Sequence, residues 1–164
     1  TELYHKETPY PEEGDKIICL RNDWNAINAS GDALVNGATG IISNIHPTEK
    51  PNPFAEKTFM ADFEPNFENS GIFTELEMDE CLFTENRLSK NKVNPEYAVP
   101  LDFAPQQFDY GYAITAWKAQ GSEYDNVLVL EENFPFKRDE HIRWLYTAAT
   151  RASKKLIIVK DYRL

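Results

Sequence analysis

The sequence predicts a mixed α/β fold in two parts, an all-β part followed by an α/β part built on a parallel sheet. Three observations predict it. Residues 15–46 and 57–80 are short apolar runs separated by turn residues. From residue 108 onward, apolar runs alternate with a helical pattern. The charge is also uneven, since residues 1–107 hold 8 Lys and Arg against 19 Asp and Glu, whereas residues 108–164 hold 9 against 8.

The length and the cysteines bound the class of protein. A chain of 164 residues fits one ordinary domain or two small ones. It contains no run of 18 apolar residues and no signal-peptide pattern at its start, so we expect a cytoplasmic protein with no membrane partner. The start lacks Met, so a fragment is expected. Cys19 and Cys81 lie in apolar runs without a CxxC or Cys/His cluster, which predicts buried thiols in a reducing compartment and no metal site.

The first predicted strands are "KIICL" at 16–20 and "GIISNI" at 40–45. Between them stand Gly31-Asp32 and Asn36-Gly37, which are turn signals because glycine adopts positive φ at little cost.

A hairpin is predicted next, formed by "KTFMADFE" at 57–64 and "GIFTELEMDE" at 71–80. Strict alternation along the second run places one set of side chains on a shared face, namely Ile72, Thr74, Leu76 and Met78. The following stretch contains Pro95, Pro100 and Pro105, which interrupt helices and central strands, so it is expected to be an irregular return connection.

The α/β part begins with "YAIT" at 112–115 and "NVLVLEE" at 126–132, which are expected to be buried strands of a parallel sheet. A helix follows over 138–153, with Asp139 and Glu140 in its first turn, where carboxylates complement the helix dipole. "KKLIIVK" at 154–160 is expected to be a third buried strand. The predicted apolar face of the helix consists of Ile142, Leu145, Tyr146 and Ala149.

Polar residues crowd the connection between the first two of these strands. Because ligands bind at the carboxyl ends of strands in open α/β sheets, the cluster is a candidate site. Gly121 would let backbone N–H groups approach a phosphate or a ribose. The alternative interpretation is an ordinary turn whose polar residues face solvent. The cluster comprises Thr115, Lys118, Gln120, Ser122 and Glu123.

Arg151 stands at the last turn of the predicted helix, one strand away from that cluster if the sheet is parallel. One interpretation is an arginine that stabilises the carboxyl end of the helix. The other is a guanidinium that binds a transferring phosphoryl group.

These two segments resemble conserved motifs of a known family. "TAWKAQGSEY" resembles motif V, and "LYTAATRASKKL" resembles motif VI, of superfamily 1 helicases of the RecD and Dda branch. "GDKIICLRNDW" followed by "VNGATGIISNI" is similar to the SH3-like domain inserted in the second RecA-like domain of that branch. The resemblance implies a partial RecA-like parallel sheet plus an inserted all-β SH3-like barrel. The implied domains are an SH3-like part at 12–107 and a RecA-like part at 108–164, with 1–11 as its remnant.

The resemblance also implies roles for single residues. Arg151 matches the catalytic arginine that reaches the ATP γ-phosphate. Gly121 and Glu123 match nucleotide-binding positions, the Glu near the ribose, and Gln120 accompanies them in the same motif.

On the DNA side, Thr115 matches a threonine that contacts a backbone phosphate. Trp117 replaces the usual histidine, and its indole could stack on a base or fill the junction between core and loop. Lys118 is placed with them. Arg21 and Asn22 of the SH3-like part are placed near DNA, although Arg-Asn-Asp is also ordinary turn chemistry.

The resemblance implies part of an ATP-dependent 5′-to-3′ DNA helicase whose partner is single-stranded DNA and whose cofactors are ATP and Mg²⁺. The chain contains no G-x-x-x-x-G-K-[ST] sequence, so the N-terminal RecA-like domain is expected to be missing and the fragment to be inactive alone. The acidic segment 47–107, with its hairpin, is expected to pack or to contact protein rather than phosphate. The alternative is a non-catalytic protein- or DNA-interaction module that retains a helicase-derived fold.

Overall fold

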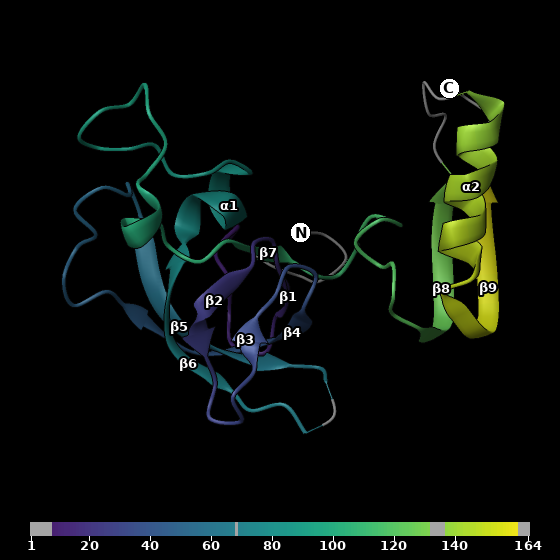
Figure 1. Cartoon of the computed structure of the whole chain (residues 1–164), viewed down its shortest axis with the longest axis horizontal. Helices are drawn as coiled ribbons and strands as arrows, with labels where there is room; N and C mark the ends of the chain where they lie inside the picture. The colour runs from purple at the N-terminus through teal and green to yellow at the C-terminus, as the bar shows by residue number, and fades with distance from the viewer. Residues whose placement is uncertain (1–7, 68, 132–136, 161–164) are drawn as a thin grey trace. The chain divides into compact units, whose positions relative to one another are not determined.

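The computed structural model describes residues 8–67, 69–131 and 137–160 (Figure 1). The chain divides into an N-terminal unit, Thr1–Tyr112, and a C-terminal unit, Ala113–Leu164. This boundary lies five residues beyond the one expected at 107/108. The physical reason is strand β7 (Phe108–Tyr110), which pairs with the first strand of the N-terminal unit instead of opening the α/β part.

The N-terminal unit is built on a five-stranded antiparallel sheet. Its strand order is β6-β5-β4-β1-β7, with β1 (Lys16–Cys19), β4 (Thr39–Pro47), β5 (Thr58–Pro65) and β6 (Phe73–Asp79). The strands and the hairpin expected in this part are therefore confirmed. A second pair, β2 (Asp23–Ile27) and β3 (Ala33–Leu34), is antiparallel and turns at Gly31, whose φ is +88°. The described residues contain mixed α and β structure with antiparallel sheets, and their strands form no closed barrel.

One apolar core fills the N-terminal unit. Phe63 lies at its centre, with no exposed surface, and its ring packs against those of Phe73 and Phe108. Cys19 and Cys81 are both buried free thiols, as expected. The buried members of the core are Ile17, Cys19, Leu34, Ala38, Ile42, Phe59, Ala61, Phe63, Phe73, Leu76, Met78, Phe83 and Phe108.

The alternation predicted along β6 is wrong at its first half. Phe73 is buried and Ile72 is exposed, while Leu76 and Met78 are buried as expected. The pairing of β5 with β6 shifts register between Ala61 and Phe63, and Glu75 has a φ of +54°. Such an irregularity inserts one residue and reverses the faces, so Phe73 joins the core on the same side as Leu76.

The return connection is irregular, as its prolines predict. After β6, helix α1 (Glu80–Glu85) begins at Asp79, whose carboxylate accepts a hydrogen bond from the backbone N–H of Cys81. A single turn of 3-10 helix, Leu101–Phe103, is the next regular element. Side chains hold the rest: Asn52 Nδ2 donates to Glu77 Oε2 and to the Phe103 carbonyl.

The C-terminal unit pairs β8 (Tyr124–Glu131) with β9 (Ala152–Lys160) in parallel, and α2 (Arg138–Ala149) covers one face (Figure 1). The strand-helix-strand order and the parallel pairing are confirmed. The strand expected over 112–115 is absent, since Tyr112 and Ala113 form a bend and the next two residues have no regular structure. None of the helices in the described part of the chain is long and apolar enough to cross a membrane.

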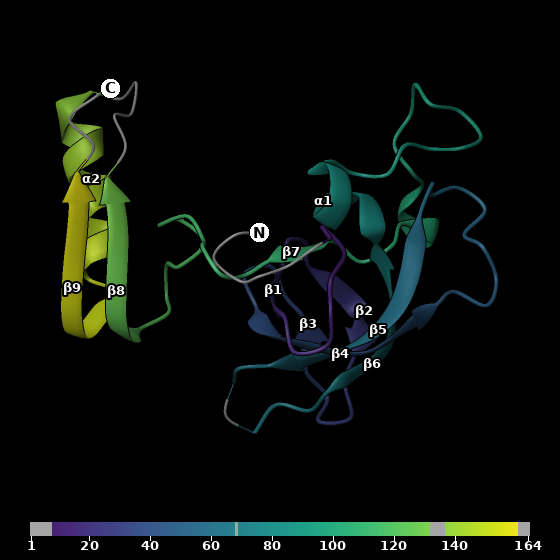
Figure 2. The ribbon, with the colours of Figure 1, turned by 180° about the vertical axis from the view of Figure 1, so that it is seen from behind.

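Two expectations about burial in this unit are wrong. Helix α2 buries Trp144 and Ala148, whereas Ile142 and Tyr146 are exposed, because the face that meets β8 is rotated along the helix from the predicted one. Strand β9 is exposed along most of its length and β8 along much of it, since each pairs with one strand only in the described part of the chain and α2 covers a single face. Figure 2 shows the face of the sheet that α2 leaves open.

Candidate functional site

The 115–123 loop lies at the amino-terminal edge of the parallel sheet, because it leads directly into β8. The sequence places these residues at the carboxyl end of a strand, and that expectation is wrong since no strand forms at 112–115. The loop is a series of tight turns, in which the backbone N–H of Ala119 bonds to the Thr115 carbonyl at 3.1 Å and that of Gln120 to the Trp117 carbonyl at 3.2 Å. Thr115 Oγ1 accepts a hydrogen bond from the Lys118 N–H at 3.3 Å.

Gly121 ends the loop with a φ of +90°, a conformation that residues with a Cβ rarely adopt. A Cβ added there would meet no atom within 4 Å, so the backbone conformation and not crowding requires glycine. The turn leads into Ser122, whose carbonyl accepts a hydrogen bond from Arg151.

Arg151 joins the end of α2 to this loop. Its guanidinium donates from Nε to the Thr147 carbonyl, from Nη1 to the Ser122 carbonyl and from Nη2 to Thr150 Oγ1, each at 3.0 Å. Its own carbonyl accepts from the Tyr124 N–H at 2.8 Å, at the start of β8. The structure therefore brings Arg151 against the 115–123 loop, as the parallel pairing predicts.

The guanidinium retains binding capacity. An arginine has five N–H donors, and three are used by these bonds. The other two have no partner among the described residues. Arg151 therefore stabilises the carboxyl end of α2, as the first interpretation expects. Its two remaining donors are compatible with the second interpretation, phosphoryl binding, which stays a prediction.

The remaining side chains predicted for the nucleotide and DNA are exposed. Glu123, Gln120 and Lys118 face solvent, and in the described chain no hydrogen bond or ion pair holds their side chains. Trp117 is 56% exposed. Such positions are open to a ligand, and the structure gives no direct contact between them and Arg151.

Arg21 and Asn22 belong to the N-terminal unit. Asn22 Oδ1 accepts the Asn36 N–H at 2.7 Å, and Arg21 Nη2 donates to the Ala104 carbonyl at 3.4 Å. Both side chains support the turns around them, which corresponds to the turn interpretation of this Arg-Asn-Asp sequence.

A polar cluster at the other end of the sheet escapes the sequence analysis. Glu131 is buried at the carboxyl end of β8, where it bonds to His141 Nε2 at 2.8 Å and pairs with Lys160 Nζ at 3.3 Å. The hydrogen bond from His141, together with Lys160, lowers the pKa of the Glu131 carboxyl against the effect of its burial. An acidic residue that ends an apolar strand is the signal that could have found it. In the described ranges, no group of three His, Cys, Asp or Glu is placed to hold a metal ion.

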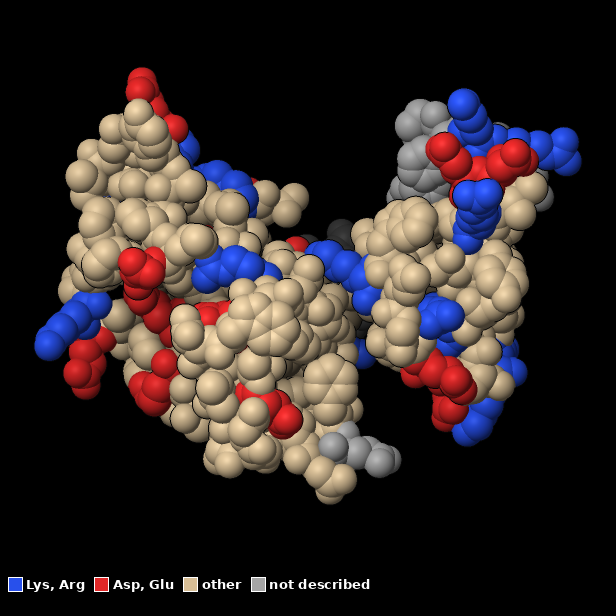
Figure 3. Space-filling view, viewed as in Figure 1, with Lys and Arg blue, Asp and Glu red and all other residues tan. Residues whose placement is uncertain are grey.

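Charged side chains of both signs are interspersed over the C-terminal unit, as the space-filling view shows (Figure 3). Near Arg151, Lys154 Nζ pairs with Asp125 Oδ2 at 2.8 Å at the start of the two strands. The edge of the sheet that carries the loop is therefore polar, and its exposed groups include both donors and acceptors.

Comparison with known proteins finds a family model and a solved structure that resemble this chain. A comparison with curated protein sequences gives no match. Among solved structures, the chain is similar to the crystal structure of Pif1 helicase from Candida albicans, with 15% identity and a TM-score of 0.49 over 96% of this chain. The chain spans 35% of that helicase's length. Residues 110–159, which contain the 115–123 loop, α2 and Arg151, match the family model of the UvrD-like helicase C-terminal domain.

Proposed function

We propose that this chain is the carboxyl-terminal part of a superfamily 1 DNA helicase that couples ATP hydrolysis to 5′-to-3′ movement along single-stranded DNA. The observation that carries the proposal is the bond between Arg151 and the Ser122 carbonyl, which places a guanidinium with two remaining donors beside the 115–123 loop. The match of residues 110–159 to a helicase C-terminal domain supports it.

In this proposal the two ligands meet at the loop. Arg151 binds the γ-phosphate through its remaining N–H groups, where positive charge stabilises the transferring phosphoryl group. Gly121, Gln120 and Glu123 hold the rest of the nucleotide, the exposed Glu123 carboxylate accepting from the ribose.

Thr115, Trp117 and Lys118 contact the DNA strand, with the exposed Trp117 indole stacked on a base. Because both ligands bind to one short loop, a change at the phosphate can be transmitted to the DNA. Arg21 and Asn22 would contribute further DNA contacts from the N-terminal unit.

ATP and Mg²⁺ are cofactors of the whole enzyme in this proposal. The exposed, unpaired side chains of the loop and the free donors of Arg151 suit the nucleotide. The phosphate-binding loop and the protein ligands of the metal would come from the N-terminal RecA-like domain, which is the proposed partner of this chain, and a chain without that domain would not turn over ATP.

We further propose that the N-terminal unit is an SH3-like insertion whose acidic hairpin contacts other protein. Its two ends meet, which supports an insertion. Tyr110 Oη donates to the Pro9 carbonyl at 3.0 Å, and the Gly111 N–H bonds to the Lys16 carbonyl at 2.7 Å. Tyr112 Oη also donates to the buried carboxylate of Asp15 at 2.7 Å.

The test is Arg151→Ala in the full-length enzyme, measured as DNA-stimulated ATP turnover. We expect a fall of about 10³–10⁵-fold, the range typical of such arginines. Arg143→Ala, which removes an exposed arginine of the same helix, should leave turnover unchanged.

Because Arg151 also makes three structural hydrogen bonds, the folded fraction and ATP affinity of each variant are measured in parallel. Arg151→Lys keeps the charge and loses the planar fork, so it should recover only part of the rate. Ordinary turnover by the folded Ala variant would refute the phosphate role.

The second candidate is a non-catalytic interaction module, which stays open because this chain contains no G-x-x-x-x-G-K-[ST] sequence. A natural protein in which no such sequence precedes this segment would support the module, and one that carries it would support the helicase.

A further inference from the structure

A depression of about 390 Å³ opens on the N-terminal unit, and none of its described lining residues is a predicted ligand contact. It lies between the β2-β3 pair and the connection from β5 to β6. Its volume suits a single large side chain or a small ligand. The lining residues that carry the argument are Trp24, Asp32, Val35, Phe67, Ser70 and Phe73.

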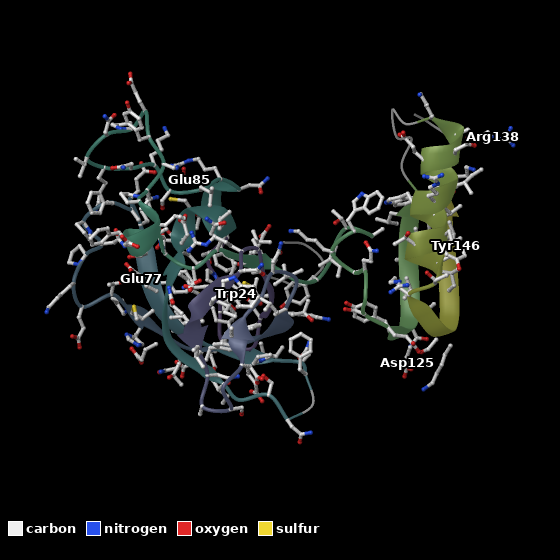
Figure 4. The ribbon with its side chains drawn as sticks, viewed as in Figure 1. Trp24, Glu77, Glu85, Asp125, Arg138 and Tyr146 are labelled. Atoms are coloured by element: carbon white, nitrogen blue, oxygen red, sulfur yellow. The ribbon has the colours of Figure 1, made fainter. Side chains whose placement is uncertain are left out.

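Aromatic rings form the rim of this depression. Trp24 is 67% exposed and Phe67 is 55% exposed, whereas Phe73 at the base is buried in the core. Figure 4 shows Trp24 on β2, on the face of the unit turned toward the viewer. Exposed aromatic faces carry partial negative charge and attract cations, most strongly at Trp.

The polar part of the lining is acidic. Among the described residues of the lining, Asp32 is the one that carries a charge, and none is Lys or Arg. Asp32 Oδ2 is held by hydrogen bonds from Asn28 Nδ2 at 3.2 Å and Ser70 Oγ at 3.1 Å. In the described part of the chain no cation pairs with this carboxylate, so a fixed negative charge stands beside two exposed rings.

We propose that this depression binds an arginine side chain of a protein partner. A planar guanidinium can stack on Trp24 or Phe67 and hydrogen-bond to the Asp32 carboxylate at the same time, which a compact ammonium does less well. The excess of 19 Asp and Glu over 8 Lys and Arg in residues 1–107 attracts a basic partner over a longer range. A nucleic-acid strand is disfavoured because the lining residues that the structure describes include no Lys or Arg for its phosphates.

The test uses the ¹⁵N-labelled chain and the peptide acetyl-Gly-Pro-Arg-Pro-Gly-amide. We expect the peptide to shift the Trp24 indole N–H resonance saturably, while those of Trp117 and Trp144 stay in place. Replacing the arginine of the peptide by norleucine keeps its apolar stem and should weaken binding about tenfold, because the stacked and paired charge is lost.

Variants locate the site by anisotropy of the fluorescein-labelled peptide. Trp24→Ala and Asp32→Asn should each weaken binding by about tenfold or more. Tyr97→Ala removes an aromatic ring that is 66% exposed elsewhere on the unit, and Asp102→Asn removes an exposed carboxylate, so both controls should bind normally.

Phe67→Leu provides a second variant if Asp32→Asn disturbs folding, since it removes a half-exposed ring while keeping apolar bulk; it should also weaken binding. Equal affinity for the norleucine peptide, or unchanged affinity in folded Trp24→Ala and Asp32→Asn, would overturn the proposal. So would an eight-residue oligothymidylate that shifts Trp24 when the arginine peptide does not, since the depression would then be a base-stacking platform.

Discussion

The two units bury their apolar residues to very different degrees. Among the described residues, the core of the N-terminal unit contains thirteen buried members, whereas that of the C-terminal unit contains Val129, Trp144 and Ala148. The strands of the second unit are no less apolar: Leu128, Leu130 and Ile157 occupy β8 and β9 and are exposed. Burial therefore depends on how many layers pack on a sheet and not on the apolar content of its strands.

The polar interactions differ in the same way. In the N-terminal unit, side chains fix long connections: the buried Asp79 carboxylate accepts from the backbone N–H groups of Cys81 and Ser89 and from the Ser89 hydroxyl. In the C-terminal unit, the bonds of Arg151 gather at one edge of the sheet. At the opposite end of that sheet, Glu131 bonds to His141 and pairs with Lys160, so the polar interactions of the second unit lie at its two ends.

The largest effect should come from Phe63→Ala in the first unit. Removing a ring that has no exposed surface should lower the free energy of unfolding of that unit by about 3–5 kcal/mol. Hydrogen exchange resolved by residue measures each unit separately. Phe67→Ala, with a half-exposed ring, is the matched control and should cost far less. Similar costs for the two variants would mean that the thirteen-residue core is not the stabilising element.

Trp144→Ala should be the next largest change and should act on the second unit alone. Trp144 is the one large side chain of that small core, and its loss should cost about 3 kcal/mol. Exchange of the β8 and β9 amides should accelerate while that of β1 and β4 stays unchanged. Tyr146→Ala on the exposed side of α2 should be nearly neutral. Faster exchange in both units would show that their stabilities are coupled.

Alkaline pH should weaken the first unit through Cys19. Burial raises the pKa of the Cys19 thiol from 9.0 to about 11. Because the pKa is higher in the folded state, the protonated thiol contributes its full stabilisation below pH 9. That stabilisation is lost as the pH rises toward 11. The loss should reach about 2 kcal/mol by pH 11, measured by urea unfolding between pH 8 and 11. Cys19→Ala should have a shallower decline, and an equal slope in both proteins would contradict the assignment.

Gly121→Ala should give the smallest effect. Because space around Gly121 is open, the cost comes only from holding a residue with a Cβ at a φ of +90°, about 1–2 kcal/mol in the second unit. Gly121→Asn should cost less, since Asn tolerates positive φ better. Thermal unfolding measures both. A larger loss for Asn than for Ala would show that side-chain volume, and not conformation, limits this position.

Much of the fold could be predicted because turns and apolar runs are local signals. Gly31 and Gly37 do adopt positive φ, and β8, α2 and β9 follow in the predicted order. The wrong predictions of burial arise where a segment distant in the sequence determines which face of a helix or strand is buried. The face of α2 that carries Trp144 depends on where β8 lies, and the reversal along β6 depends on the conformation of Glu75. Neither is encoded in hydrophobic periodicity.

In the candidate site, too, some features could be predicted from the sequence and others could not. The proximity of Arg151 to the 115–123 loop could be predicted, since parallel strands bring their preceding segments to one edge. The hydrogen-bond acceptor of Arg151 in this loop could not be predicted, because it is the backbone carbonyl of Ser122, a group that every residue possesses. The roles of Gln120, Glu123, Thr115 and Trp117 toward ligands stay predictions.

The hydrogen bond from Tyr110 to the Pro9 carbonyl bears on how the N-terminal unit could be moved between proteins in evolution. The chain enters and leaves the first unit, a segment of roughly a hundred residues, at neighbouring points. The pairing of β1 with β7 inside the unit holds these two ends together. In the proposed insertion, the host domain would therefore only have to join two chain ends that already lie close together, as it does across a tight turn. The unit could be replaced by a bridge of two or three residues, or moved to another surface loop, without separating the two chain ends of the host.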